Sequence, residues 1–314
     1  MLNTIISAVK LLRPRQWIKN LAVFAAITFS GHLFDPDIFQ KALLGFFAFC
    51  GLSSATYVFN DFFDINKDKL HPFKKFRPLP HGDLPVKLAL GIAIVLTISS
   101  LLLGFFVTPA FFILGLVYLV LQFLYSAFLK TIAILDILII ATGYILRVYA
   151  GEAASGFHIS VWLLLTMISL SLFLAVGKRR SELTLISNIK AVRIGDIRKT
   201  LSHYSERLLD MYASIFATSA FVSYALFTFL ENPKGVRLGI SILLPDFLPA
   251  FFQRKWLMIT IAPVVYGLMR YLQDIYEKSE GESPERVLLS DKPLLISVII
   301  WFILVVGIIY FIRP

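Results

Sequence analysis

Four residues that could hold a metal ion lie close together in YVFNDFFDINKDKL, residues 57–70: Asn60, Asp61, Asp64 and Asp68. If this segment is helical, the three aspartates at i, i+3 and i+7 share one face. Carboxylates held that close repel one another, and one would take up a proton unless a cation neutralises them. Such oxygen ligands favour Mg²⁺, which also binds substrate phosphates. The alternative is a solvated helix end whose acids pair with Lys67 and Lys69.

A basic segment follows the aspartates directly. HPFKKFRP, residues 71–78, contributes His71, Lys74, Lys75 and Arg77. Acids beside bases suit a diphosphate complexed with Mg²⁺, because the acids hold the metal while Lys and Arg bind the remaining oxygens. We therefore predict Asn60 and the three aspartates as metal ligands, and Arg77 as a catalytic residue beside Asp61, Asp64 and Asp68. Lys74 could bind phosphate as well, although Lys74 and Lys75 could equally be topology signals.

A second basic cluster occurs in FLAVGKRRSEL, where Lys178, Arg179 and Arg180 precede Glu182. We predict all four as substrate-binding residues, because this cluster suits more anionic charge than one diphosphate carries. A topology signal is the alternative.

Asp136 and Arg147 interrupt an apolar stretch at a spacing of eleven residues. That spacing is three helical turns, or ~16 Å, which is too long for a direct pair. We expect Asp136 to face a cavity. For Arg147, a packing role or an extension to the membrane surface competes with a role in binding.

The composition indicates the kind of fold that must position these residues. Of the 314 residues, 58% are hydrophobic and the mean hydropathy is +0.78, which indicates a polytopic membrane protein. The single cysteine, Cys50, excludes an internal disulfide, and the histidines lack zinc-ligand spacing. The net charge of +10 is explained first by membrane topology, and we predict no nucleic-acid partner.

The apolar segments predict an all-α bundle. We expect residues 1–314 to form one membrane domain, with the motif loops at residues 60–87 and 178–207. We expect about nine spans, at 18–34, 39–59, 88–107, 110–129, 132–151, 159–177, 208–230, 255–271 and 293–312. Residues 88–129 carry no charge, and Pro109 divides them into a hairpin. With a cytoplasmic N-terminus, cytoplasmic segments hold 23 of the 30 Lys and Arg residues and the opposite side holds six. This bias predicts that the N-terminus and both motif loops are cytoplasmic.

These motifs resemble those of a known family. YVFNDFFDINKDKLHPFKKFRP is similar to the first aspartate-rich motif of the UbiA superfamily of intramembrane prenyltransferases. The resemblance implies a helical bundle in the cell membrane, with a polar cavity open to the cytoplasm and Mg²⁺ joining aspartates to a diphosphate. Tyr125 and Lys130 match a tyrosine and a lysine common near superfamily sites. The position of a second aspartate-rich motif holds the basic cluster 178–180 instead.

One branch of this superfamily resembles the sequence more than the other branches do. LLRPRQWIKNLAVFAA, LFLAVGKRRSEL and YLQDIYEKSEGESPERVLLSDKPLL look like segments of decaprenyl-phosphate phosphoribosyltransferases. This resemblance implies transfer of phosphoribose from 5-phosphoribosyl diphosphate (PRPP) to a polyprenyl phosphate, in the synthesis of cell-envelope glycan precursors. Lys19 and Arg15 are then candidates for binding the lipid phosphate.

Two alternatives stay open from the sequence. The chain could move a polyprenyl group to an aromatic acceptor such as 4-hydroxybenzoate, or it could transport lipid phosphates, which would not require the three aspartates. The sequence leaves open the length of the polyprenyl chain and whether the protein forms a homo-oligomer.

Overall fold

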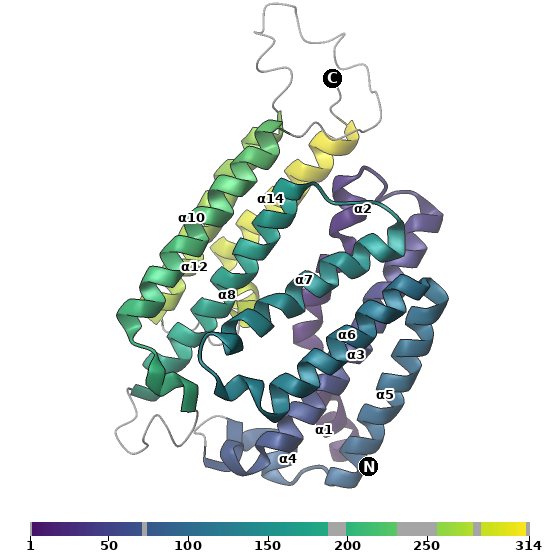
Figure 1. Cartoon of the computed structure of the whole chain (residues 1–314), viewed down its shortest axis with the longest axis vertical. Helices are drawn as coiled ribbons and strands as arrows, with labels where there is room; N and C mark the ends of the chain where they lie inside the picture. The colour runs from purple at the N-terminus through teal and green to yellow at the C-terminus, as the bar shows by residue number, and fades with distance from the viewer. Residues whose placement is uncertain (1, 71–73, 188–198, 231–255, 279–283, 312–314) are drawn as a thin grey trace, which may run out of the picture.

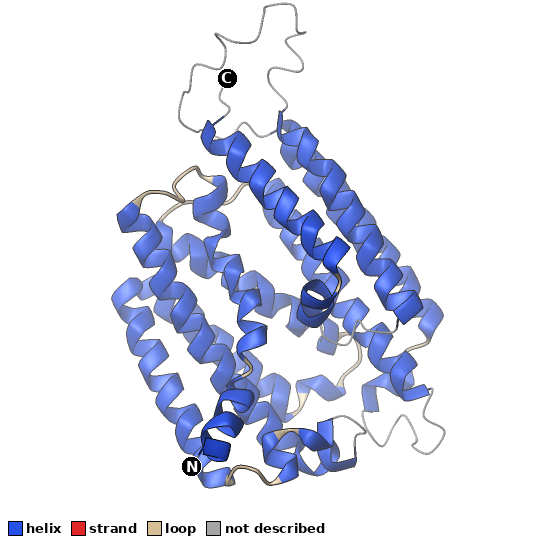
Figure 2. Ribbon diagram, turned by 180° about the vertical axis from the view of Figure 1, so that it is seen from behind, coloured by secondary structure: helices blue, strands red, loops and turns tan. Residues whose placement is uncertain are grey.

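The computed structural model describes residues 2–70, 74–187, 199–230, 256–278 and 284–311. Every regular element in these residues is a helix (Figures 1 and 2), which confirms the all-α prediction for this part of the chain. The long helices are α3 (Pro36–Leu70), α5 (Val86–Val107), α6 (Pro109–Ala127), α7 (Leu135–Ser155), α8 (Val161–Ser187), α10 (Glu206–Leu230), α12 (Ile261–Lys278) and α14 (Lys292–Phe311). The shorter ones are α1 (Leu2–Leu12), η1 (Pro14–Phe24), α2 (Ala25–Phe29), η2 (Lys74–Phe76), α4 (Pro78–His81), η3 (Leu129–Thr131), η4 (Lys199–His203), η6 (Trp256–Thr260) and α13 (Pro284–Ser290).

Seven helices in the described residues are long and apolar enough to cross a membrane: α3, α5, α6, α7, α8, α10 and α14. They coincide with seven of the nine predicted spans. The predicted span 18–34 is divided between the 3-10 helix η1 and the short helix α2. The predicted span 255–271 overlaps η6 and α12, whose last turns are charged. The total of nine spans and the cytoplasmic N-terminus therefore stay predictions.

Local sequence signals explain where the long helices begin and end. The carboxylate of Asp35 accepts from the backbone N–H groups of Asp37 and Ile38 at the start of α3. Thr108 accepts from the backbone N–H of Phe111 and so caps α6, whose first residue is Pro109. The predicted hairpin within residues 88–129 is confirmed at this position. Helix α3 continues to Leu70, as the spacing of the aspartates requires.

The helices are arranged around α3 and α7 (Figure 1). About 61% of the most apolar window of α3 and 56% of that of α7 is buried, against 22% for α5 and α6. Helices α3 and α7 are therefore central, whereas α5 and α6 expose apolar side chains such as Phe106 and Ile113, as expected for helices in contact with lipid. Helix α7 lies between a group formed by α3, α5 and α6 and a group formed by α8, α10, α12 and α14.

Gly151 allows the close approach of η1 to α7. A Cβ atom at this position would lie 2.1 Å from the backbone oxygen of Val23, so any larger side chain would force the two segments apart. This contact holds η1 beside α7 and thereby positions Lys19 and Asn20 of η1 at the centre of the bundle.

Candidate active site

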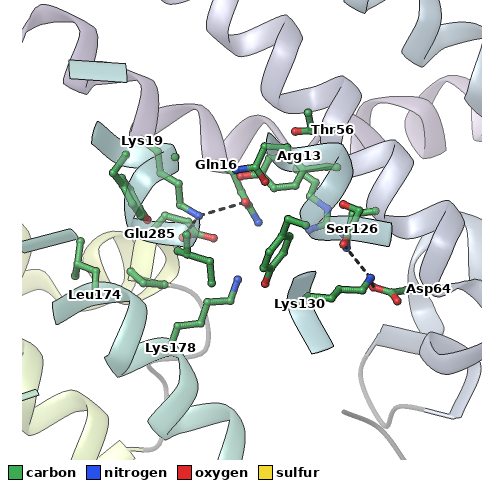
Figure 3. Close-up of a pocket in the computed structure, with 18 of the residues that line it drawn as sticks. Arg13, Gln16, Lys19, Thr56, Asp64, Ser126, Lys130, Leu174, Lys178 and Glu285 are labelled. Carbon is green, nitrogen blue, oxygen red and sulfur yellow. Dashed lines mark hydrogen bonds and ion pairs between the residues drawn. The ribbon is translucent and has the colours of Figure 1, made fainter. Parts of the chain in front are cut away.

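A polar cavity lies between η1, α3, α6, α7, α8 and α13 (Figure 3). Its basic lining residues are Arg13, Lys19, Lys74, Arg77, Lys130, Arg147 and Lys178. Its acidic lining residues are Asp64, Asp68, Glu182 and Glu285. The described lining thus carries three more basic than acidic groups, and such an excess attracts anionic ligands.

The aspartate face of α3 is neutralised by cations from other segments. Arg77 donates from Nη1 to Asp68 Oδ2 at 2.7 Å and to Asp61 Oδ1 at 3.0 Å. Asp61, which is 1% exposed, also pairs with Arg13. Lys130 donates to Asp64 Oδ2 at 2.6 Å, an interaction drawn in Figure 3. The bridge from Arg77 to Asp61 and Asp68 shows that these two aspartates share a face, as predicted.

Asn60 belongs to the same cluster, because its Oδ1 accepts from Lys130 at 3.4 Å. Carboxylate and amide oxygens are the ligand types that Mg²⁺ prefers, so the donor set fits this ion. In the described part of the chain, however, no group of three or more His, Cys, Asp or Glu side chains has the geometry of a metal site. The aspartates are separated by their basic partners, and a metal would have to exchange with Lys130 or Arg77.

The three basic side chains of the α8 cluster point in three different directions. Consecutive residues of a helix are rotated by about 100°, so Lys178, Arg179 and Arg180 cannot face one cavity together. Lys178 extends into the polar cavity (Figure 3) and forms no hydrogen bond or ion pair with any residue that the structure describes. The structure places neither Arg179 nor Arg180 in the lining, so geometric support for the predicted substrate contacts is limited to Lys178 and Glu182.

Arg179 is fully buried in a network of side chains that holds α8 in place. Its guanidinium lies 2.6 Å from Asp136 Oδ2 and 2.7 Å from Glu182 Oε2, and it donates to the Tyr125 hydroxyl at 2.9 Å. Tyr204 donates to Asp136 Oδ1 at 2.7 Å. The network adjoins the cavity through Tyr125 and Glu182, both of which line it.

Arg180 faces α10 on the other side of α8. Its Nε lies 2.7 Å from Asp210 Oδ1, and its Nη2 lies 3.2 Å from Glu206 Oε2. Lys74 lines the cavity and pairs with Glu182 at 3.1 Å, and its predicted role in phosphate binding stays a prediction. His71 lies outside the described residues.

The prediction that Asp136 faces the cavity was wrong. Asp136 is fully buried with Arg179 and does not line the polar cavity, because that ion pair satisfies it inside the bundle. Arg147 lines the cavity instead. The sequence spacing correctly excluded a direct pair between these two residues, but it could not show which of them faces the cavity.

An apolar pocket adjoins the polar cavity. It is lined by side chains of α8, α12 and α14, among them Met167, Phe173, Leu268 and Trp301. Five residues line both spaces: Lys19, Tyr144, Leu174, Pro284 and Glu285. Arg15, by contrast, is exposed and lines neither space.

Lys19 and Glu285 form an ion pair of 2.9 Å at this shared wall. Burial by itself raises the pKa of Glu285, but the ammonium of Lys19, a backbone hydrogen bond and the nearby charge of Lys178 together hold the pKa of this carboxyl below its ordinary value. Glu285 is therefore ionised at neutral pH, and it places a negative charge where the two spaces meet.

Arg13 and Glu285 were missed by the sequence analysis. Arg13 lies within the quoted segment LLRPRQWIKN, and its backbone is left-handed, with φ 52° and ψ 59°. Non-glycine residues rarely adopt this conformation, and strained residues of this kind cluster at functional sites. Glu285 follows a proline in a charged segment near the C-terminal end, where the sequence offered no signal except the resemblance of that segment to the phosphoribosyltransferase branch.

Comparisons with known proteins agree with this geometry. Residues 21–299 match the profile of the UbiA prenyltransferase family. The chain belongs to this family. The decaprenyl-phosphate phosphoribosyltransferase of Mycolicibacterium smegmatis is 34% identical over 313 residues, which cover 98% of this chain and 94% of that relative. The protein of the same name from Mycobacterium tuberculosis H37Rv is 31% identical over 95% of this chain and 93% of its own length.

The solved structures of UbiA homologues have the same fold. A UbiA homolog from Archaeoglobus fulgidus bound to DMAPP and Mg²⁺ superposes with a TM-score of 0.68 at 19% identity, covering 96% of this chain and 99% of that one. The same homolog bound to GPP and Mg²⁺ gives 0.68 at 20% identity over the same shares of the two chains. The predicted membership of the superfamily is confirmed, and with it the assignment as a multi-pass membrane protein.

Proposed function

We propose that this UbiA-family protein transfers a 5-phosphoribosyl group from PRPP to a polyprenyl phosphate and releases diphosphate. Near-full-length similarity to decaprenyl-phosphate phosphoribosyltransferases supports this activity. The observation in the structure that favours it most is the contact between a cavity with excess basic charge and an apolar pocket. The two spaces match a highly anionic sugar donor and an acceptor with a long apolar chain.

Mg²⁺ is the metal that we propose for this reaction. Asn60, Asp61, Asp64 and Asp68 would hold it, since their oxygens fit its preferences. A bound Mg²⁺ would supply charge neutralisation on the diphosphate of the donor. Arg77 and Lys130, which occupy the aspartates in this structure, would then be available to bind phosphate oxygens.

The side chains of the cavity mouth stabilise the leaving group. As the bond between the ribosyl carbon and the diphosphate breaks, negative charge grows on the diphosphate, and Arg77, Lys74 and Lys130 are positioned to stabilise it. Positive charge develops on the ribosyl carbon, and a phosphate oxygen of the acceptor attacks from the opposite face. This oxygen is already anionic at neutral pH, so the reaction requires no strong general base.

The acceptor binds across the shared wall in this proposal. Lys178 and Lys19 contact the lipid phosphate, because Lys178 has no partner among the described residues and Lys19 lines both spaces. The polyprenyl chain lies against Phe173, Leu268 and Trp301 in the apolar pocket.

Membrane placement follows from the distribution of charge. The excess of basic residues around both motif loops supports a location of these loops, and of the mouth of the polar cavity, at the cytoplasmic side of the cell membrane. Helix α3 then runs inward, so that its aspartates lie at its cytoplasmic end.

A transfer assay with two donor–acceptor pairs tests the proposed function. Purified protein with Mg²⁺ receives either PRPP and a polyprenyl phosphate, or a polyprenyl diphosphate and 4-hydroxybenzoate. We expect a ribosylated lipid from the first pair and no prenylated product from the second. Product from the second pair alone would replace the proposal with aromatic prenyl transfer.

A further inference from the structure

Arg147 is a buried cation at the wall of the polar cavity. It lies past the middle of α7, and only 4% of it is exposed. Its Nε donates to Asn20 Oδ1 at 2.6 Å, its Nη2 donates to the Tyr118 hydroxyl at 3.0 Å, and its Nη1 donates to the backbone oxygen of Gly143. The ring centroid of Tyr118 lies 4.9 Å from its guanidinium carbon.

These partners are all neutral. No carboxylate among the described residues pairs with Arg147, although a charged side chain within a membrane helix requires an internal partner or an aqueous cavity. Three neutral acceptors satisfy part of its hydrogen-bonding capacity, since a guanidinium has five N–H donors, but they leave its charge uncompensated. The cavity therefore contains a positive charge that an anionic ligand could neutralise.

The other arginines and lysines of the cavity are accounted for. Arg13 and Arg77 pair with aspartates of α3, Lys130 pairs with Asp64, Lys74 with Glu182 and Lys19 with Glu285. Lys178 has no acidic partner among the described residues; it extends into the polar cavity (Figure 3), and the proposed function assigns it to the phosphate of the acceptor. Lys19 lines both spaces whereas Arg147 lines the polar cavity alone, so Lys19 is better placed than Arg147 for the head group of a lipid bound in the apolar pocket.

Arg147 also lies apart from the aspartates. Asn20, which accepts from Arg147, donates to Ser53 Oγ at 3.3 Å. Ser53 precedes Asp61 by eight residues in α3, which is a rise of ~12 Å at 1.5 Å per residue. A sugar with phosphate groups at both ends spans a length of this order. A ligand with its diphosphate at the aspartates could therefore extend its second phosphate toward Arg147.

We propose that Arg147 binds the 5-phosphate of the phosphoribosyl donor, at the end of the cavity remote from the aspartates. The assignment rests on the proposed function. The planar guanidinium offers paired N–H donors to a phosphate, and Asn20 and Tyr118 fix its orientation before the donor arrives. The site then requires a phosphate at the far end of the sugar, and it selects PRPP over ribose 1-diphosphate.

Ligand binding to the purified protein tests this site without turnover. Isothermal calorimetry measures the binding of ribose 5-phosphate, and of diphosphate with Mg²⁺, to the wild type and to Arg147→Met. We expect the variant to weaken binding of ribose 5-phosphate about 10- to 100-fold, as the loss of charged hydrogen bonds implies, and to leave diphosphate binding within about twofold. Arg270→Met is the matched control, because it removes an arginine that pairs with Asp291 and lines neither space. Arg147→Lys keeps the charge and should show an intermediate loss.

Several results would overturn the assignment. The assignment fails if the wild-type protein does not bind ribose 5-phosphate. It also fails if Arg147→Met binds ribose 5-phosphate as tightly as the wild type does. A parallel loss of both ligands would indicate a packing role, and a rise in the KM for the polyprenyl phosphate alone would assign Arg147 to the acceptor. If ribose 5-phosphate binding depends on Arg147 while the wild type transfers no phosphoribose, the proposed function fails and the phosphate site stands.

Discussion

The Nζ of Lys19 lies 2.9 Å from the Oε2 of Glu285, at the wall that the polar cavity shares with the apolar pocket. The two residues come from opposite ends of the chain, in η1 and α13. Their contact joins the N-terminal segment to the C-terminal helices, and it places one positive and one negative charge where a lipid phosphate would have to pass between the two spaces.

Glu285→Gln should lower the KM for the polyprenyl phosphate. The substitution keeps a hydrogen-bonding side chain beside Lys19 but removes a negative charge that repels the acceptor. Removal of ~1 kcal/mol of repulsion corresponds to a decrease of about 3- to 10-fold. Initial rates at varied acceptor concentration measure this effect, with Lys19→Met as the opposing variant, which should raise the same KM. An increase in KM in Glu285→Gln would contradict the proposed role of the pair.

The same carboxyl should make stability depend on pH in the acid range. The pKa of Glu285 is depressed in the folded protein because Lys19, a backbone hydrogen bond and Lys178 together outweigh the effect of burial. A depressed pKa contributes stability above the ordinary value, roughly pH 4.3, and that contribution is lost as the pH falls through the folded value. The difference in Tm between the wild type and Glu285→Gln should therefore shrink as the pH is lowered through this window. A difference that stays constant would show that the pair adds no stability.

Arg179→Met should destabilise the protein far more than Arg180→Met. Arg179 is fully buried against Asp136 and Glu182, and its removal leaves the buried carboxylate of Asp136 without a cation, at a cost of about 3–5 kcal/mol, while Glu182 keeps Lys74. Arg180 pairs with half-exposed acids of α10, so its loss should cost about 0–1 kcal/mol. Thermal unfolding in detergent measures both. Equal stability of the two variants, with a raised KM for PRPP in Arg179→Met, would restore Arg179 as a direct ligand.

The features that are determined within a single helix, or at a helix end, could be predicted from the sequence. The spacing of Asp61, Asp64 and Asp68 required α3 to continue past the membrane segment, and the helix extends to Leu70. Pro109 ended one span and began the next because proline favours the first helical turn. In both cases the determining interactions are local, so the residue pattern contains them.

The contacts between distant segments were not predictable in the same way. The cluster 178–180 contains three basic residues on three faces of α8, and only the packing of α8 against α10 and α7 decides which of them meets the cavity. Arg13 reaches Asp61 across 48 residues of sequence, and no spacing rule connects the two. The expectation for Asp136 was wrong, and the role of Arg147 was left open, for the same reason: periodicity relates the residues of one helix to each other but does not identify their neighbours on other helices.

Gly151→Ala tests whether η1 is held against α7 as described. The added Cβ would lie 2.1 Å from the backbone oxygen of Val23, so η1 must move, at a cost of about 1–3 kcal/mol. The movement would also shift Lys19, and we expect a lower Tm together with a higher KM for the acceptor. Gly91→Ala in α5 is the control, because no atom lies within 4 Å of its Cβ and alanine favours the helix by roughly 0.5–1 kcal/mol. Equal effects of the two substitutions would contradict the close packing of η1.

The fate of the two halves of PRPP shows whether the protein transfers phosphoribose to a lipid. Purified protein, Mg²⁺ and a polyprenyl phosphate receive PRPP labelled separately in the ribose ring and in the diphosphate, and the products are divided between a lipid phase and an aqueous phase. We expect the ribose label to enter the lipid phase while the diphosphate label stays in water, and we expect Asp64→Asn to reduce this transfer at least ~100-fold by removing a proposed metal ligand. Ribose label that remains in the aqueous phase with the wild type, or enters the lipid together with the diphosphate label, would contradict the proposed transfer.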